Sequence, residues 1–277
     1  MAINYSTTEV SAHYEKRHGL RTGLFGDKPY ANYGYWTKPG ITIDEACDAL
    51  TDLMAQELEL NGSDRLLECG CGYGASALFL GAKYRPREIV GLDVTPVRIE
   101  EGNRLARERG LGDIIKLQQG DATKLPFEDR SFTKMLAIEC AFHFNTRVDF
   151  LRQSLRVLAP GGVLSMTDIV LAPHVNRKDY SLEQLREFLS ADAKFICDAN
   201  IYSAEEYKRL LHEVGFQSAK IYSIKEKVVM QFADHLDRVA AASPPDAAAR
   251  RHAVADTFRN NLWVGGDYVV VRAQKNS

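Results

Sequence analysis

The stretch Arg65-Leu-Leu-Glu-Cys-Gly-Cys-Gly-Tyr-Gly-Ala-Ser-Ala-Leu-Phe-Leu-Gly-Ala-Lys83 decides the fold of this chain. It begins as a short apolar strand, passes through three glycines at alternate positions, and continues with helical spacing from Ala75. Gly70, Gly72 and Gly74 allow a tight turn and a close approach of the backbone to a ligand. The following helix presents free N–H groups and a positive dipole end, which suit an anionic group. The stretch therefore predicts a ligand site between a strand and a helix.

Short apolar runs and helical patterns alternate on both sides of this stretch. Helical spacing covers 97–109 and 146–158. This βαβα order predicts an α/β fold with a doubly wound, mostly parallel, seven-stranded sheet and helices on both faces. The expected strands are 65–69, 88–92, 113–117, 132–140, 162–170, 216–229 and 267–273.

Four segments are expected along the chain. Residues 1–61 form N-terminal helices and an aromatic lid, and residues 62–172 form a cofactor-binding core. Residues 173–215 form a helical cap insertion above the carboxyl edge of the sheet, where open α/β sheets bind ligands. Residues 216–277 complete the sheet with a helical segment. Ser181 and Gln184 have the spacing of a capping box at the start of a cap helix.

The composition is that of an ordinary globular protein. The 277 residues are 45% hydrophobic and 26% charged, with a formal net charge of −2. That charge gives no electrostatic reason to expect a nucleic acid or an anionic membrane as partner. Neither a signal peptide nor a membrane span is evident, so a cytoplasmic location is expected. The five cysteines are scattered and are interpreted as free thiols; no metal site is expected. Homo-oligomerisation is left open.

Acidic residues stand at the ends of the first three strands. Because the carboxyl ends of parallel strands meet at one edge, Glu68, Asp93 and Asp121 are expected to lie together. Glu68 suits the ammonium group of a cofactor, and Asp93, followed by Val94, suits ribose hydroxyls. Asp121 suits the exocyclic amine of adenine, with the backbone N–H of Ala122 as a further donor.

A nicotinamide dinucleotide is an alternative cofactor. The pattern Gly70-x-Gly72-x-x-Ala75 also satisfies the relaxed dinucleotide fingerprint. Against it, the carboxylate of Glu68 would repel a pyrophosphate bound at the loop.

These motifs, in this order over roughly residues 62–172, resemble class I S-adenosylmethionine-dependent methyltransferases. Tyr33-Gly-Tyr-Trp36, Gly91–Pro96, Glu139–His143 and Asp168 more narrowly resemble actinomycete natural-product methyltransferases of the erythromycin 3''-O- and rebeccamycin sugar 4'-O-methyltransferase types. The resemblance implies S-adenosylmethionine as cofactor and a small organic molecule as acceptor. It also implies that Tyr33-Gly-Tyr-Trp36 folds over the cofactor, with Tyr33 beside it. Glu139 is expected near the methionine end of the cofactor.

His143 and Asp168 are the candidate catalytic residues. A hydroxyl acceptor must lose its proton, and a histidine titrates near neutrality and suits a general base. A carboxylate on the second ring nitrogen would fix its tautomer. The similar sugar O-methyltransferases carry His and Asp at matching positions, which implies the same roles here. Glu139 is the reserve base, and a purely structural histidine is the alternative for His143.

Aromatic residues predict a largely apolar acceptor pocket. The candidates are Tyr35, Trp36, Phe142 and Phe144, with Phe188, Phe195 and Tyr202 in the cap. Methyl transfer to a hydroxyl of a natural product is the leading hypothesis. Transfer to carbon of a terpenoid or another electron-rich compound, or to nitrogen, stays open. An NAD-dependent oxidoreductase and a non-catalytic cofactor-binding protein are the remote alternatives.

Overall fold

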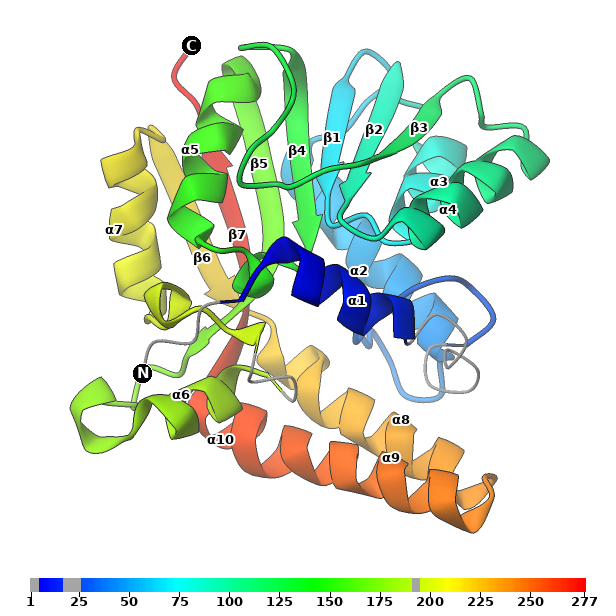
Figure 1. Cartoon of the computed structure of the whole chain (residues 1–277), viewed down its shortest axis with the longest axis vertical. Coiled ribbons are helices and arrows are strands. Elements are labelled where there is room, and N and C mark those ends of the chain that lie inside the picture. Colours follow the sequence, from blue (N-terminus) through cyan, green and yellow to red (C-terminus); the bar gives the residue numbers. More distant parts are fainter. Residues whose placement is uncertain (1–4, 17–25, 191–194) are drawn as a thin grey trace.

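The computed structural model describes residues 5–16, 26–190 and 195–277. Its centre is a seven-stranded sheet in the order β3-β2-β1-β4-β5-β7-β6, in which β7 is antiparallel to its two neighbours (Figure 1). The predicted doubly wound, mostly parallel α/β fold is therefore confirmed. The strands are β1 (Arg65–Cys69), β2 (Glu88–Asp93), β3 (Ile115–Gln119), β4 (Phe132–Ile138), β5 (Leu158–Leu171), β6 (Ser218–Ser223) and β7 (Gly266–Gln274).

Helices cover both faces of this sheet. The helices α2 (Ile43–Leu58), α3 (Ala75–Lys83) and α4 (Pro96–Glu108) pack on one face, and α5 (Arg147–Val157) and α7 (Ala204–Val214) pack on the other (Figure 1). Each face of the sheet packs against its helices in a separate hydrophobic core, and successive side chains along a strand point alternately into the two cores. On β1, Leu66 is buried in the first core and Leu67 in the second, and neither has exposed surface.

The central elements form where the sequence predicts them. β1 and α3 have the predicted bounds, and the capping box of Ser181 and Gln184 is present. The third strand starts at Ile115, two residues later than expected, because Ile114 and Ile115 still donate to the carbonyl of Leu111 in a turn. The predicted strand 216–229 is wrong beyond Ser223, since the chain there enters a short 3₁₀ turn, Lys225–Lys227, and then α8 (Val229–Ala241).

The segment 173–215 does not form a single cap. The helix α6 (Leu182–Leu189) lies beyond the carboxyl ends of the strands, beside α10 (Trp263–Gly265) (Figure 1). By contrast, α7 packs beside α5, with Tyr207 and Leu211 fully buried against the sheet. The physical reason is its amphipathic pattern, which buries one stripe of the helix against the sheet. Only the first half of the segment is therefore available as a cap.

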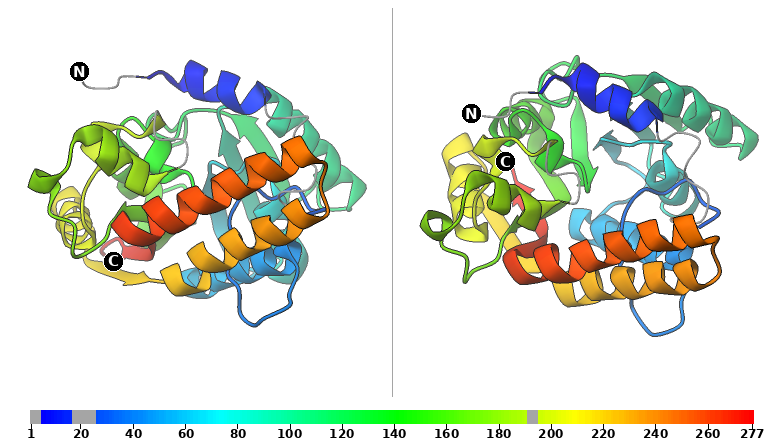
Figure 2. Two further views of the ribbon diagram at one scale, coloured as in Figure 1. Left: turned by 90° about the horizontal axis from the view of Figure 1, so that it is seen from below. Right: turned by 60° about the horizontal axis from the view of Figure 1, so that its bottom comes forward.

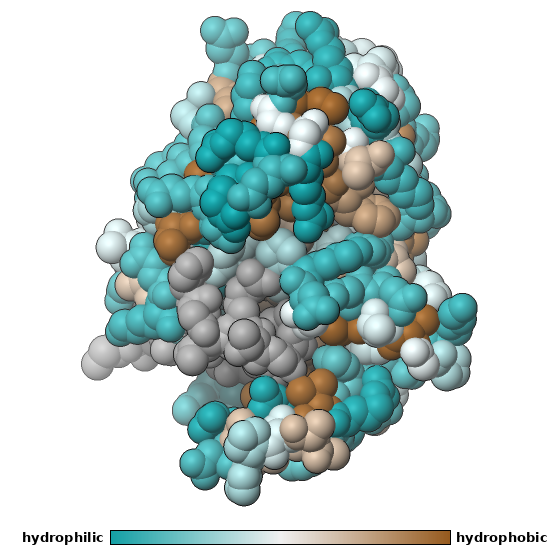
Figure 3. All heavy atoms as spheres, turned by 90° about the vertical axis from the view of Figure 1, so that its right-hand side faces the viewer, coloured by the Kyte–Doolittle hydropathy of each residue, from teal (hydrophilic) through white to brown (hydrophobic). Residues whose placement is uncertain are grey.

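Further helices lie near the carboxyl edge. The helix α1 (Thr7–Lys16) crosses this edge, and α8 (Val229–Ala241) and α9 (Pro245–Thr257) form a hairpin (Figures 1 and 2). A π-helical turn, Phe258–Leu262, joins α9 to α10. Figure 3 shows the side of the molecule that lies to the right in Figure 1. Among the described residues on this face, hydrophilic side chains dominate, and apolar ones occupy small separate areas. In the described ranges, no helix combines the length and the apolar character that crossing a membrane requires.

Candidate active site

The glycine loop after β1 has the geometry that its sequence requires. Gly70, Gly72 and Gly74 all have φ between 54° and 71°, a left-handed backbone conformation that residues with a side chain rarely adopt. A Cβ atom on Gly70 would lie only 2.6 Å from Cβ and Sγ of Cys140, the residue that follows β4 by two positions. Gly74 is the N-cap of α3. The loop is therefore folded tightly against the end of β4.

The loop forms one wall of a cavity at the carboxyl edge of the sheet. The parallel register pairs Cys69 with Leu92 and Asp93 with Gln119, so the strands end side by side. The cavity receives predicted site residues from the ends of four strands. These residues are Glu68, Gly70, Gly72, Asp93, Val94, Asp121, Ala122 and Glu139, with His143 and Phe144 beyond them.

Glu68 is a buried carboxylate in the wall of the cavity. It is only 2% exposed, its Oε1 accepts a hydrogen bond from the Ser76 hydroxyl, and its Oε2 has no hydrogen-bond partner. Burial raises the pKa of this carboxyl to about 7, and the charge of Asp93 adds to the effect. A buried acceptor without a donor is costly, so this oxygen suits a cationic ligand group.

Asp93 and Asp121 are half-buried and are held by backbone donors. Asp93 Oδ2 accepts from the N–H of Gly72 at 3.0 Å, and its Oδ1 accepts from the N–H of Thr95 at 2.9 Å. Asp121 Oδ1 accepts from the N–H and the hydroxyl of Thr123. These bonds fix both carboxylates at the rim of the cavity. Each retains lone pairs for hydroxyl or amine donors of a ligand.

Glu139 is held rigidly at the end of β4. Its φ of 50° is left-handed, a strained conformation for a residue with a side chain. Its N–H donates to Thr167 Oγ1, and its Oε1 accepts from the Tyr33 N–H at 2.8 Å and from the Tyr268 hydroxyl at 2.5 Å. Burial raises the pKa of this carboxyl to about 8, while the two hydrogen bonds act in the opposite direction.

His143 lies in a short 3₁₀ helix, Ala141–His143, and reaches the cavity. Its Nδ1 is 3.0 Å from the carbonyl oxygen of Phe195, and its Nε2 is 3.0 Å from the hydroxyl of Tyr14. A carbonyl oxygen only accepts, so we assign the ring proton to Nδ1. In the neutral imidazole, Nε2 then carries the lone pair that a general base needs.

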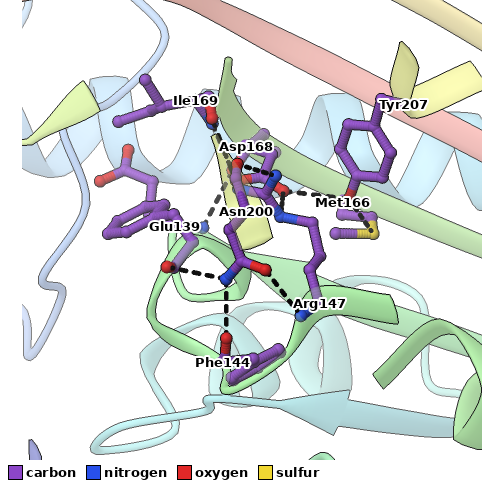
Figure 4. Close-up of polar contacts among 10 residues, drawn as sticks. Glu139, Phe144, Arg147, Met166, Asp168, Ile169, Asn200 and Tyr207 are labelled. Carbon is purple, nitrogen blue, oxygen red and sulfur yellow. Dashed lines mark hydrogen bonds and ion pairs between the residues drawn. The ribbon is translucent and has the colours of Figure 1, made fainter. Parts of the chain in front are cut away.

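The expected contact between Asp168 and His143 does not form. Asp168 has no exposed surface and forms an ion pair with Arg147, with Asp168 Oδ2 at 2.9 Å from Arg147 Nε (Figure 4). The Tyr207 hydroxyl donates to the same oxygen at 3.0 Å. The carbonyl of Phe195 takes the position at His143 that the sequence assigned to Asp168. Asp168 is enclosed in the core because β5 is covered on both faces of the sheet at this residue.

The ion pair connects β5 with the loop that carries His143. Arg147 follows that loop, and its backbone N–H donates to Oδ1 of Asn200 at 2.9 Å. The Asn200 amide donates to the carbonyls of Phe142 and Phe144, the residues that flank His143 (Figure 4). Asp168, Arg147 and Asn200 therefore support the position of His143 without touching its ring.

Most of the predicted aromatic acceptor residues do not line the cavity. Tyr33, expected beside the cofactor, does not line the cavity either, because its ring packs against Phe232, Phe258 and Tyr268. Its backbone N–H, by contrast, reaches a cavity residue, Glu139. Tyr35, Trp36 and Phe142 belong to the core, where Trp36 packs against His235 of α8. In the described cap, Phe188 packs on Tyr180, and Tyr202 lies beside Tyr207 and under Arg147. Only Phe144 lines the cavity, and Phe195 reaches His143 through its carbonyl.

Sequence reasoning missed the residues that close the cavity. Tyr5, Thr7, Val10 and Tyr14 come from α1 and the residues before it, and Arg98 comes from the first turn of α4. The polar and apolar pattern of α1 is weak, and only Val10 of that helix is buried. The aromatic residues in the N-terminal stretch were the available signal.

Comparison with known proteins places this site in a family. A family model described as a methyltransferase domain matches residues 67–166. Erythromycin 3''-O-methyltransferase of Saccharopolyspora erythraea is 31% identical over 211 residues, which cover 74% of this chain and 68% of that protein. The 27-O-demethylrifamycin SV methyltransferase of Amycolatopsis mediterranei is 31% identical over 209 residues, covering 76% and 74%.

The chain belongs to the class I S-adenosylmethionine-dependent methyltransferases. This methyltransferase is of the natural-product type, and its cofactor is S-adenosylmethionine. The family decides against the nicotinamide alternative. The unpartnered Oε2 of Glu68 and the anchored carboxylates of Asp93 and Asp121 fit the cationic amino group and the adenosine of that cofactor.

Solved structures support the fold of the methyltransferase. The [4+2]-cyclase SpnF superimposes with a TM-score of 0.80 at 24% identity, covering 99% of this chain and 98% of that one. Geranyl diphosphate C-methyltransferase from Streptomyces coelicolor gives a TM-score of 0.73 at 18% identity, covering 99% and 100%. At these identities the likeness concerns the fold alone.

Proposed function

We propose that this methyltransferase transfers a methyl group to a hydroxyl of a small, largely apolar natural product, with His143 as the general base. The observation that carries the proposal is the arrangement of the His143 ring. The Phe195 carbonyl holds Nδ1, so Nε2 is the basic nitrogen in the same cavity as Glu68 and Asp93. The names of the two relatives, which specify methylation of oxygen, support this choice of acceptor atom.

In this proposal the strand-end residues hold the cofactor. The glycine loop, with Gly74 starting α3, accepts the amino-acid part, and Glu68 binds its ammonium group. Asp93, with Val94 beside it, binds the ribose hydroxyls, and Asp121 and Ala122 bind the adenine. Tyr33 acts indirectly, since its N–H fixes the carboxyl of Glu139 at the cavity wall.

The chemistry requires proton removal and exclusion of water. The bound cofactor supplies an electrophilic methyl group on a sulfonium, so the protein has mainly to orient an acceptor for in-line attack. His143 removes the proton that the acceptor hydroxyl loses. The residues of α1 cover the cavity and keep water from the reacting atoms. Phe144 offers apolar contact to the acceptor.

A panel of hydroxylated natural products tests the proposal. We expect the purified protein, with S-adenosylmethionine, to add one methyl group to at least one compound of a panel that includes 27-O-demethylrifamycin SV, an erythromycin with a free 3''-hydroxyl, and hydroxylated polyketide lactones. Mass spectrometry detects the transfer, and the carbon chemical shift of the new methyl group distinguishes O-methyl from C-methyl and N-methyl products. A methyl group on carbon or nitrogen, or methylation of no hydroxyl in the panel, would contradict the proposal.

Cofactor affinity is expected to depend on pH through Glu68. Its pKa of about 7 means that the carboxyl is protonated below neutrality and must lose that proton to bind an ammonium group. Affinity for S-adenosylhomocysteine should therefore be full above pH 7 and fall about tenfold for each pH unit below it. Calorimetric titration from pH 5.5 to 8.5 measures this fall in affinity, which is the acidic limb of the pH profile.

Glu68→Gln is the matching variant. It keeps the shape of the side chain but removes the charge, so binding at pH 8 should weaken about 10- to 100-fold, and the limb near pH 7 should disappear. Glu139→Gln serves as the control, since it removes the other raised carboxyl of the cavity and should leave that limb in place. An unchanged pH dependence in Glu68→Gln would show that Glu68 does not bind the ammonium group.

A further inference from the structure

The helix α1 brings an aromatic hydroxyl to His143. Tyr14 lies near the carboxyl-terminal end of this helix, which crosses the carboxyl edge of the sheet (Figure 2). Its hydroxyl oxygen is 3.0 Å from Nε2 of His143, and the two rings meet edge to face with centroids 6.0 Å apart. Both side chains line the cavity that also contains Glu68 and Asp93.

Arg98 holds the other side of Tyr14. Its guanidinium carbon is 4.4 Å from the centroid of the Tyr14 ring and 5.1 Å from that of Tyr73 in the glycine loop. Arg98 is only 7% exposed, and its Nε has no hydrogen-bond partner. Tyr14 is therefore placed between a buried cation on the side of the glycine loop and an imidazole on the other side.

The proton positions follow from the partners of His143. Because the Phe195 carbonyl can only accept, Nδ1 donates to it, and the lone pair of the neutral ring is on Nε2. Tyr14 must then donate its hydroxyl proton to Nε2. The lone pair of Nε2 is therefore already engaged by the Tyr14 hydroxyl. The proton of an acceptor hydroxyl in the cavity would reach Nε2 through the Tyr14 oxygen.

We propose that Tyr14 is a second catalytic residue, which relays the proton of the acceptor hydroxyl to His143. This inference rests on the proposed function. The acceptor oxygen forms a bond to the methyl carbon as the methyl–sulfur bond breaks, and the electron pair of that bond stays on sulfur. The acceptor proton passes to the Tyr14 oxygen while the proton of Tyr14 passes to Nε2 of His143. Tyr14 ends neutral, and the positive charge of the sulfonium is replaced by that of the imidazolium.

The contact with Arg98 supports the relay electrostatically. As protons move along the chain, negative charge develops on the Tyr14 oxygen. A guanidinium over the ring stabilises that charge, and the exclusion of water strengthens the effect. Arg98 also fixes the orientation of the ring, so the hydroxyl stays in line with Nε2.

Tyr14→Phe tests the relay in turnover. This variant keeps the ring under Arg98 and removes only the hydroxyl. With the panel compound that is methylated, for example 27-O-demethylrifamycin SV, the single-turnover rate should fall about 10- to 100-fold. The dissociation constant of S-adenosylhomocysteine should stay within about twofold, which a collapse of α1 would not allow. Tyr222→Phe is the control. Tyr222 lies on the outer strand β6, its hydroxyl donates to Glu57 of α2, and the variant should keep the wild-type rate.

A second measurement needs no acceptor. The hydroxyl of Tyr14 donates to neutral Nε2 and so favours the neutral ring. In the complex with S-adenosylhomocysteine, the pKa of His143 followed by ¹⁵N NMR should rise by about 0.5 to 1 in Tyr14→Phe. The signal is assigned by its loss in His143→Ala. An unchanged titration would overturn the relay, since the two groups would then not share a proton.

The two levels of the proposal fail differently. A panel in which no hydroxyl is methylated would overturn the proposed function and the relay with it. If a panel hydroxyl is methylated and Tyr14→Phe transfers the methyl group to it at a rate within twofold of wild type, the relay alone would be overturned. A fall in rate together with a raised pKa of His143 would support both.

Discussion

His143→Ala is expected to lower the rate of methyl transfer by about 10² to 10⁴, the range that general acid–base catalysis contributes. The variant removes the imidazole whose Nδ1 is held by the Phe195 carbonyl and whose Nε2 is the proposed basic nitrogen in the cavity. Glu68 and Asp93 are untouched, so the dissociation constant of S-adenosylhomocysteine should stay within about twofold. Single-turnover assays with the methylated panel compound and calorimetry of S-adenosylhomocysteine measure the two quantities.

Two further measurements make this result specific. Added imidazole should restore part of the rate of His143→Ala, because it fits the space that the ring leaves. His174→Ala, which removes an exposed histidine in the segment after β5, should have the wild-type rate. Near-normal turnover of His143→Ala would remove the general-base role and make Glu139, the reserve base at the end of β4, the next residue to replace.

Asp168→Ala is expected to lower the free energy of unfolding by about 3 to 5 kcal/mol. The variant leaves the guanidinium of Arg147 buried without its carboxylate, and Arg147 has no exposed surface. It also removes the acceptor of the Tyr207 hydroxyl. Since a domain of this kind is stable by only about 5 to 15 kcal/mol, the loss is large. Urea denaturation measures it.

The double variant Arg147→Met/Asp168→Leu separates stability from catalysis. It replaces both charges with apolar side chains, so much of the lost stability should return. The rate of methyl transfer should then recover to the extent that the His143 loop regains its position. If Asp168→Ala instead keeps the unfolding free energy of the wild type and still loses methyl transfer, Asp168 would have the direct catalytic role that the sequence indicated.

The sequence determined the sheet and the position of the carboxylates. The alternation of apolar runs with helical patterns is a local signal, and the bounds of β1 and α3 follow from it. Once the sheet is parallel, its strand ends must meet at one edge. Glu68, Asp93 and Asp121 therefore come together whatever the loops do.

Only the tertiary structure decided how the carboxyl edge is covered and what His143 contacts. The partners of its ring, Phe195 and Tyr14, are 52 and 129 residues away in the sequence, on segments without a strong periodic pattern. Asp168 faces Arg147 because β5 is buried on both faces, which the residue types of one strand do not specify. Local periodicity encodes helices and strands, whereas contacts between loops depend on how the completed layers pack.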